Sequence, residues 1–114
     1  MDFQLPQNTV FYQLEKTMKL YRKLAQNRIH TAGYNVSVNQ LILLVQLNER
    51  PASTQVELSA SIFKDFASVA RMVDLLVKKG FLARSENAKD RRKKDLKPTP
   101  VAKEMLQVLY PVIL

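Results

Sequence analysis

The chain has no cysteine, one histidine and only two glycines among its 114 residues. Without cysteine it can form no disulfide, no thiolate-ligated zinc site and no thiol-based redox sensor. The single histidine, His30, has no cluster of acidic or cysteine ligands around it in the sequence. We therefore expect it to interact with a helix dipole and expect no metal site. So few glycines, with five prolines, also argue against long flexible linkers and an all-β fold.

Signals for secretion, membrane insertion and catalysis are equally scarce. The first residues, MDFQLPQNTVFYQ, lack the basic and then apolar pattern of a signal peptide. No apolar run approaches the roughly 18 residues of a membrane span. The chain also has no glycine-rich phosphate loop, no cysteine nucleophile and no dense acidic cluster. We therefore expect a soluble, cytoplasmic protein that is not an enzyme and that holds no cofactor.

Positive charge is what the chain has in excess. The net charge is +8, and it is unevenly placed, because residues 64–97 hold eleven Lys and Arg against five Asp and Glu. The length is enough for one domain with a buried core. A basic cluster on one part of a domain is typical of a protein that binds a polyanion. Charge alone is equally compatible with a solvated face that only keeps the protein soluble.

The region before this basic segment predicts two helices. From Thr9 to about Ala32, apolar residues recur at steps of three and four, and Gly33 fits the position just after a helix end. The apolar stripe of this first helix contains Phe11, Leu14, Met18, Tyr21, Ala25 and Ile29. Ser37 is a good N-cap for a second helix, from Val38 to about Glu49. That helix is apolar nearly all round and is expected to be central.

A short helix, a turn and a longer helix follow. Thr54, with Glu57 three residues later, forms the capping-box pattern that opens a short helix ending near Ile62. The longer helix is predicted from about Asp65 to Lys79, and Gly80 can close it in the left-handed conformation. Its inward stripe is expected to contain Val69, Val73 and Leu76.

Two short strands and a final helix complete the pattern. Residues 81–84 and 95–97 are strand candidates, and the charged residues 86–94 between them suit a hairpin loop. Pro100 fits the first turn of the last helix, whose apolar positions are Val101, Met105, Leu106 and Leu109. Its apolar end, residues 109–114, is expected to pack on a partner or to belong to a helix that is incomplete. A helix-turn-helix followed by a basic hairpin is the order of a winged helix, which reads DNA with its second helix and its hairpin tip.

Roughly residues 37–106 resemble the MarR family of winged-helix transcriptional regulators. Residues 37–43, SVNQLIL, look like the family's helix leading into the DNA-binding lobe, and residues 54–58, TQVEL, are similar to its T-Q-x-E-L opening. Residues 68–84 resemble its recognition helix and the exit into the wing. Asp90-Arg91-Arg92 matches the D-x-R signature of the wing, and Leu96 and Thr99 follow as in the family.

The chain also departs from the family pattern. Ala67 and Ala70 stand where the family often has Ser or Thr, so two hydroxyls that could contact bases or phosphates are missing. Pro98 and Ala102 replace an apolar residue and a glycine that are common after the wing, so we expect the last helix to enter at an unusual angle.

The resemblance implies a mainly α fold with a small two-stranded wing, dimerised through N- and C-terminal helices. It divides the chain into a dimerisation helix at 1–36, a DNA-binding lobe at 37–99 and an incomplete dimerisation helix at 100–114. It also implies a homodimer that binds double-stranded DNA, more often as a repressor, and a small aromatic effector between the first helix and the lobe. The expected DNA-binding residues are Thr54, Gln55, Lys64, Ser68, Arg71, Arg84, Lys89, Asp90, Arg91 and Arg92.

The wing residues have distinct expected roles. Arg92 is the arginine of the D-x-R signature and is expected to enter the minor groove, where a narrow A/T-rich groove attracts a guanidinium. Asp90 would orient that arginine, and Arg91 would lie along the phosphates. The alternative for these residues is a disordered, charged loop without a ligand.

The helix residues have alternatives too. Ser68 and Arg71 lie three residues apart on one helix face and can contact bases or phosphates, or else partner each other on the surface. Lys64 is expected at a phosphate. Phe66 fits either the core or a contact with a thymine methyl group, and we expect the core. The competing function for the whole chain is a winged helix that binds a protein within a larger assembly, without specific DNA binding.

Overall fold

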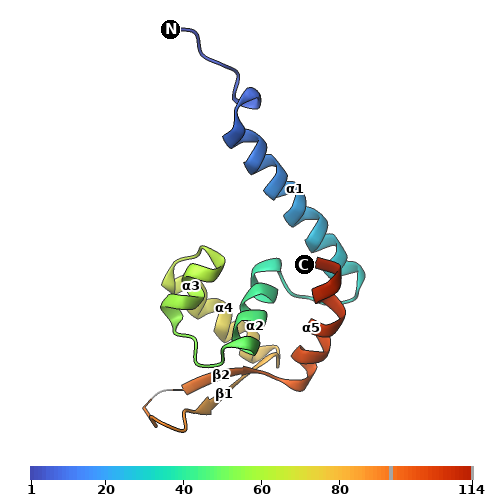
Figure 1. The fold of residues 1–114 in the computed structure, drawn as a ribbon. Coiled ribbons are helices and arrows are strands. Elements are labelled where there is room, and N and C mark those ends of the chain that lie inside the picture. Colours follow the sequence, from blue (N-terminus) through green and yellow to red (C-terminus); the bar gives the residue numbers. More distant parts are fainter. Residues whose placement is uncertain (93, 114) are drawn as a thin grey trace.

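The computed structural model describes residues 1–92 and 94–113. Lys93, one of the cations of the basic segment, and Leu114, the end of the apolar tail, lie outside the described residues. The fold is mainly α with a two-stranded antiparallel wing, as the sequence predicts (Figure 1). In chain order the elements are η1 (Pro6–Asn8), α1 (Val10–Thr31), α2 (Val38–Glu49), α3 (Gln55–Ile62), α4 (Phe66–Lys78), β1 (Leu82–Glu86), β2 (Lys94–Pro98) and α5 (Pro100–Ile113).

Local capping sets the helix starts at the expected residues. The Ser37 hydroxyl accepts a hydrogen bond from the Gln40 backbone N–H at the start of α2, and Thr54 does the same for Glu57 at the start of α3. Each partner side chain accepts in return from the backbone N–H of the capping residue. These reciprocal bonds satisfy N–H groups that a helix cannot pair internally, so both starts are defined by sequence neighbours.

The turn between α3 and α4 contains a strained residue. Phe63 is the C-cap of α3, has a φ of 56° and is 88% exposed. The left-handed conformation is costly for a bulky L-residue, whereas the glycines that end α1 and α4, Gly33 and Gly80, adopt it at little cost.

Replacing the strained residue should stabilise the fold. We expect Phe63→Gly to raise the free energy of unfolding by about 1 kcal/mol, because glycine removes the left-handed penalty and the exposed ring contributes few contacts. Urea unfolding monitored by circular dichroism measures the change. A lower unfolding free energy would mean that the ring makes compensating contacts.

One apolar core connects α2, α4 and α5. Leu41, Leu44 and Leu47 of α2 are fully buried, which confirms that this helix is central. The inward stripe of α4 is buried as expected and consists of Val69, Val73 and Leu76.

The apolar end of the chain is only partly covered within the chain, since Tyr110 and Val112 are 51% and 44% exposed. Leu106, Leu109 and Ile113 are buried in the core, because α5 lies against α1 and α2. Val101, which was expected on the packed stripe, is 59% exposed at the first turn of α5. The helix also runs on through Pro111, so α5 spans most of the segment after Pro100.

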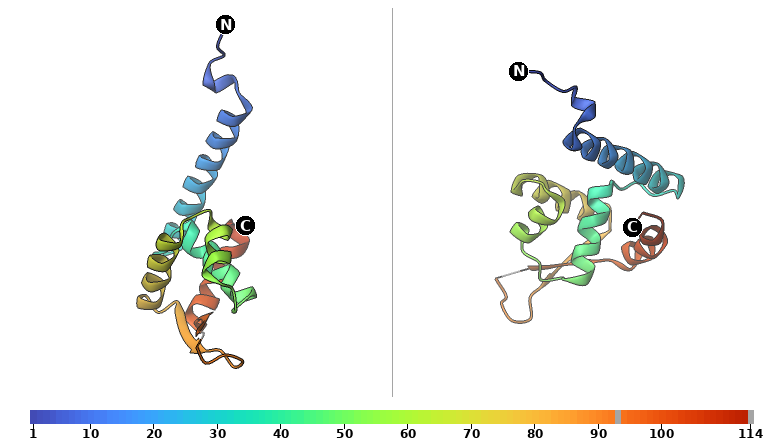
Figure 2. Two further views of the ribbon diagram at one scale, coloured as in Figure 1. Left: turned by 90° about the vertical axis from the view of Figure 1, so that its left-hand side faces the viewer. Right: turned by 45° about the horizontal axis from the view of Figure 1, so that its top comes forward.

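The first helix projects from the lobe. The radius of gyration is 17.1 Å, against about 13 Å for a compact chain of this length, and α1 accounts for the elongation (Figures 1 and 2). Its C-terminal half is anchored, because the Tyr21 hydroxyl donates to the Ile113 carbonyl at 2.6 Å and Ala25 and Ile29 are buried. The same stripe is exposed further towards the N-terminus, at Phe11, Leu14 and Met18.

The wing is slightly longer than the sequence indicates. Leu82 pairs with Pro98 and Glu86 with Lys94, so two residues that were assigned to the loop extend the strands. The base of the wing is fixed to the end of α4. The Phe81 N–H donates to the Leu76 carbonyl, and the Thr99 hydroxyl donates to the Gly80 carbonyl at 2.6 Å. The hairpin therefore leaves the lobe in one defined direction.

Candidate nucleic-acid interface

Helix α4 separates a buried face from a polar, solvent-facing one. Val69, Val73 and Leu76 hold the helix against the core. The opposite face exposes Arg71 and, two turns later, Lys78. Lys78 is not among the DNA-binding residues predicted from the sequence. Because Lys78 is exposed on the same face as Arg71, we include it among the candidate DNA-binding residues.

A hydrogen-bonded triad stands at the start of α4. The Asp65 carboxylate accepts from the Ser68 N–H at 2.8 Å and from the Ser68 hydroxyl at 2.9 Å. The Arg71 guanidinium donates to the Ser68 hydroxyl at 3.2 Å. The bonds from Ser68 hold the pKa of Asp65 below its ordinary value, with a smaller contribution from the charge of Arg71. Ser68 and Arg71 thus share a face, as expected, but they also partner each other.

The wing tip is an ordered turn around Asn87. Its side-chain carbonyl accepts from the backbone N–H groups of Lys89 and Asp90 at 2.8 and 3.1 Å, and its amide donates to Asp95 at 3.0 Å. Asp90 then accepts from the backbone N–H of Arg92 at 3.0 Å and lies 3.4 Å from its Nε atom. The aspartate therefore touches the arginine that we expected it to orient.

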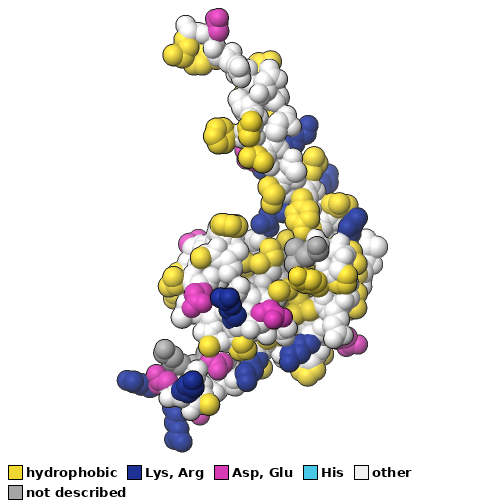
Figure 3. Space-filling view, viewed as in Figure 1, with side chains coloured by type: hydrophobic (Ala, Val, Ile, Leu, Met, Phe, Trp, Pro, Cys, Tyr) yellow, Lys and Arg dark blue, Asp and Glu magenta, His cyan; other side chains and the backbone are white. Residues whose placement is uncertain are grey.

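The outer side of this turn is cationic. The Arg92 side chain is 93% exposed although it pairs with Asp90, and Lys89 and Arg91 are exposed beside it. Figure 3 shows the Lys and Arg side chains gathered at the end of the hairpin. An exposed cationic tip on an ordered turn can approach phosphates or a groove without rearrangement of the backbone.

An ion pair connects the wing to the recognition helix. The Arg84 guanidinium of β1 donates to the Asp74 carboxylate of α4 at 2.6 Å. The charge of Arg84 is therefore compensated in the free protein. Because the pair is exposed, it orients the wing relative to α4 more than it stabilises the fold.

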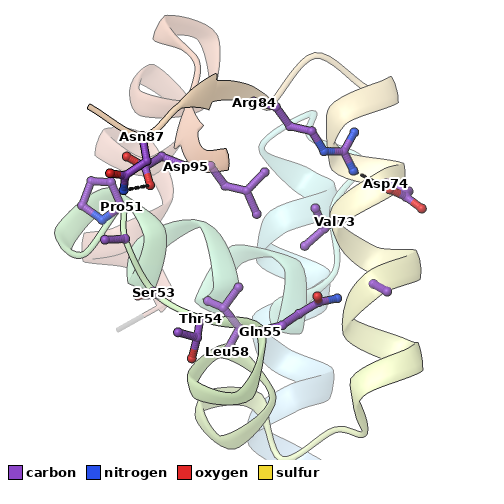
Figure 4. A pocket seen from close by; sticks show the side chains of 13 residues that line it. Pro51, Ser53, Thr54, Gln55, Leu58, Val73, Asp74, Arg84, Asn87 and Asp95 are labelled. Atoms are coloured by element: carbon purple, nitrogen blue, oxygen red, sulfur yellow. Dashed lines mark hydrogen bonds and ion pairs between the residues drawn. The ribbon is translucent and has the colours of Figure 1, made fainter. Parts of the chain in front are cut away.

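A groove lies between the start of α3, α4 and the wing (Figure 4). It has a volume of about 420 Å³ and is lined by apolar side chains, including Leu58 and Val73, and by the polar groups of Gln55 and Asn87. The Arg84–Asp74 ion pair and the Asn87–Asp95 hydrogen bond form part of its wall.

The structure brings most of the expected DNA-binding residues to two places. Lys64, Ser68 and Arg71 stand at the start of α4, and the wing carries Arg84 and residues 89–92. Thr54 and Gln55 open α3 beside the groove, and the Thr54 hydroxyl is engaged in the helix cap. Phe66 was expected in the core but is 56% exposed, because the first residue of α4 projects beyond the packed part of the helix.

Metal-binding and membrane-spanning features are absent from the described residues. Within residues 1–92 and 94–113, no group of three or more His, Asp or Glu side chains could hold a metal ion. No helix in the described part of the chain is long and apolar enough to cross a membrane.

A helix-turn-helix with an ordered, basic hairpin against its second helix defines the winged-helix class of DNA-binding proteins. The MarR family profile matches residues 36–94, more than half of the chain, and the chain belongs to the MarR family. That family consists of DNA-binding transcriptional regulators, which are not enzymes. A comparison with curated protein sequences finds no match.

Solved structures of the family share the fold. CouR from Rhodococcus jostii RHA1 bound to p-coumaroyl-CoA has a TM-score of 0.84 and 18% identity, over 97% of this chain and 77% of that chain. The transcriptional repressor CouR bound to a 23-mer DNA duplex gives 0.80 and 16%, over 99% and 80%. Apo MarR from E. coli gives 0.77 and 20%, over 92% and 76%. At these identities the matches establish the fold.

Proposed function

We propose that the protein is a homodimeric, sequence-specific DNA-binding repressor whose affinity for its operator is controlled by a small aromatic ligand. The observation that carries the proposal is the joint placement of α4 and the wing tip. Both are fixed to one lobe, and both present exposed cations, Arg71 and Lys78 on the helix and Lys89, Arg91 and Arg92 on the wing. Two elements arranged in this way can engage a major groove and the adjacent minor groove together.

The roles proposed for individual residues follow from their surroundings. Arg92 enters the minor groove, because its guanidinium is exposed and Asp90 holds its backbone and Nε atom. Lys64, Lys89 and Arg91 bind phosphates, since their exposed ammonium and guanidinium groups lie at the edges of the two contacting elements. Arg71 reads a base, because only part of its set of N–H donors is used by Ser68.

The homodimer is supported by the uneven burial of the stripe on α1. Ala25 and Ile29 are buried by the rest of the chain, whereas Phe11, Leu14 and Met18 continue the same stripe into solvent. An apolar stripe of this kind that continues into solvent usually marks an interface. A second copy that covers it would place two recognition helices in successive major grooves about 34–36 Å apart.

The ligand is supported by the groove beside α4 and the wing. Its volume falls within the range of about 300–1,000 Å³ that is common for small-molecule sites, and its lining mixes apolar and polar groups. A ligand seated there would touch both DNA-contacting elements and so favour one arrangement of them over another. We had expected the ligand between the first helix and the lobe, and soaking with small aromatic acids distinguishes the two places. CouR, a relative in fold, binds p-coumaroyl-CoA.

Removing the wing arginine tests the DNA-binding proposal. We expect Arg92→Ala to weaken binding to an enriched operator fragment by about 1–3 kcal/mol, because the guanidinium no longer occupies the groove. The fold should be unaffected, since surface substitutions usually change stability by no more than about 0.5 kcal/mol. A mobility-shift titration measures the affinity, on duplexes enriched from fragmented genomic DNA.

Lys16→Ala is the control, because it removes an exposed cation of α1, away from both contacting elements. Equal affinities of Arg92→Ala and Lys16→Ala would show that Arg92 does not enter the groove. The alternative function is a protein-interaction module. It would replace the DNA-binding proposal if the parent protein enriches no DNA but a protein binds specifically to the wing.

A further inference from the structure

The first turns of α4 offer few polar groups with which to read bases. Ala67 and Ala70 have none. The Ser68 hydroxyl already donates to Asp65 and accepts from Arg71, so it can offer a base only its one remaining acceptor lone pair. Between residues 66 and 71, only the Arg71 guanidinium keeps several unused donors. Hydrogen bonding by this stretch can therefore specify few base pairs.

Apolar surface is exposed at the same place. Phe66 is the first residue of α4 and is 56% exposed, and Ala67 beside it is also exposed. The buried residues of α4 begin only at Val69, one turn later, so the core does not enclose the ring. Lys64 and Arg71, both exposed, flank it in the sequence. The exposed ring and the two cations thus belong to the same end of α4, the end of a recognition helix that usually enters the major groove.

Resting on the proposed function, we infer that Phe66, assisted by the methyl group of Ala67, determines sequence specificity by packing on the C5-methyl group of a thymine in the major groove. This methyl group is the apolar feature that the major-groove edges of the bases present, and phenylalanine and alanine are side chains that contact it. The cations at this end of α4 favour DNA as the occupant over a protein surface, because Lys64 can bind a phosphate and Arg71 a base next to the one that the ring contacts. In each half-site, Arg71 would then specify a guanine and Phe66 a thymine.

The test removes only the methyl group. A randomised duplex library is selected with the full chain, and the enriched duplex is resynthesised with deoxyuridine in place of each thymine in turn. We expect one position in each half-site to bind about fourfold more weakly, the equivalent of one methyl group taken out of contact. When both half-sites are substituted, we expect a loss of about fifteenfold, if the two half-sites contribute equally.

A double-mutant cycle assigns the effect to the ring. Phe66→Ala should lose most of the discrimination between the thymine and deoxyuridine duplexes, because only the methyl group of Ala67 remains, whereas Phe66→Leu should keep a larger part of it. Phe3→Ala is the matched control, because it removes another exposed ring, from the segment before η1, and it should discriminate as the parent does. Circular dichroism checks that the α4 variants remain folded.

The outcomes separate this inference from the proposed function. A library that yields no enriched sequence overturns the proposed function, and the inference with it. An enriched sequence that tolerates deoxyuridine at every position overturns the inference alone, as does equal discrimination by the parent and Phe66→Ala. Retention of an enriched sequence with selective loss at the thymine positions in Phe66→Ala supports both.

Discussion

Raising the salt concentration from 50 to 200 mM should weaken operator binding by about 10³- to 10⁵-fold. This range corresponds to about six to ten phosphates neutralised by a dimer. When a Lys or Arg side chain neutralises a phosphate, the counterions condensed on the DNA there are released. The segment of residues 64–97 carries enough charge for that number, because it holds eleven cations and a net charge of +6 in each chain. Mobility-shift titrations in a series of salt concentrations give the slope of log affinity against log salt.

A single-residue variant calibrates that slope. Arg91→Ala, which removes one exposed cation of the wing tip, should lower the slope by about 0.9 for each phosphate that is no longer neutralised. Lys16→Ala, which removes an exposed cation of α1 outside both contacting elements, should leave the slope unchanged. A parent protein whose affinity is flat across the salt series would contradict the phosphate-dominated interface.

Leu14→Asp should convert the proposed dimer to a monomer and lower operator affinity by about 10²- to 10⁴-fold. Leu14 is 59% exposed on the uncovered half of the α1 stripe, so a charge there would be desolvated only in an interface. The operator affinity falls because two half-sites no longer bind as one linked unit. Sedimentation at micromolar concentration measures the association state, and a mobility shift on the full operator measures the affinity.

The dimer interface can be tested only at a position that is exposed in the monomer. Leu109→Asp, at the apolar end of the chain, would place a charge in the core, because Leu109 is 1% exposed. It would therefore unfold the lobe instead of testing the interface. Asn27→Asp is the matched control, since it adds the same charge at an exposed position of α1, about opposite to Leu14 around the helix. A parent that sediments as a monomer and still binds a full operator tightly would refute the dimer.

The helix boundaries could be predicted because their causes are local. Ser37 and Thr54 bond to residues three positions later, and Gly33 and Gly80 adopt the backbone conformation that ends a helix. Such signals need no knowledge of the tertiary structure. The positions of the recognition helix and the wing follow from these boundaries, and so most of the candidate interface could be placed from sequence.

Features that depend on contacts between residues far apart in the sequence could not be predicted. Phe66 lies near the apolar side of α4, but the core does not reach the first turn, so periodicity overestimates its burial. Leu109 resembles an interface residue until α1 and α2 are seen to cover it. The partner of Arg84 is Asp74, ten residues away, and their contact exists only once the wing folds back on α4.

Because the wing is attached to α4, the distance between the two parts of the lobe that would contact DNA is fixed. The bonds of Phe81 to Leu76 and of Thr99 to Gly80, with the bridge from Arg84 to Asp74, fix the separation between the helix start and the hairpin tip. In the proposed complex, the base pairs read by α4 and the A/T-rich stretch entered by Arg92 must then stand a constant number of base pairs apart. One inserted base pair would turn the second feature by about 34° around the helix axis and out of reach. Operators of this protein should therefore vary in base identity more readily than in internal spacing.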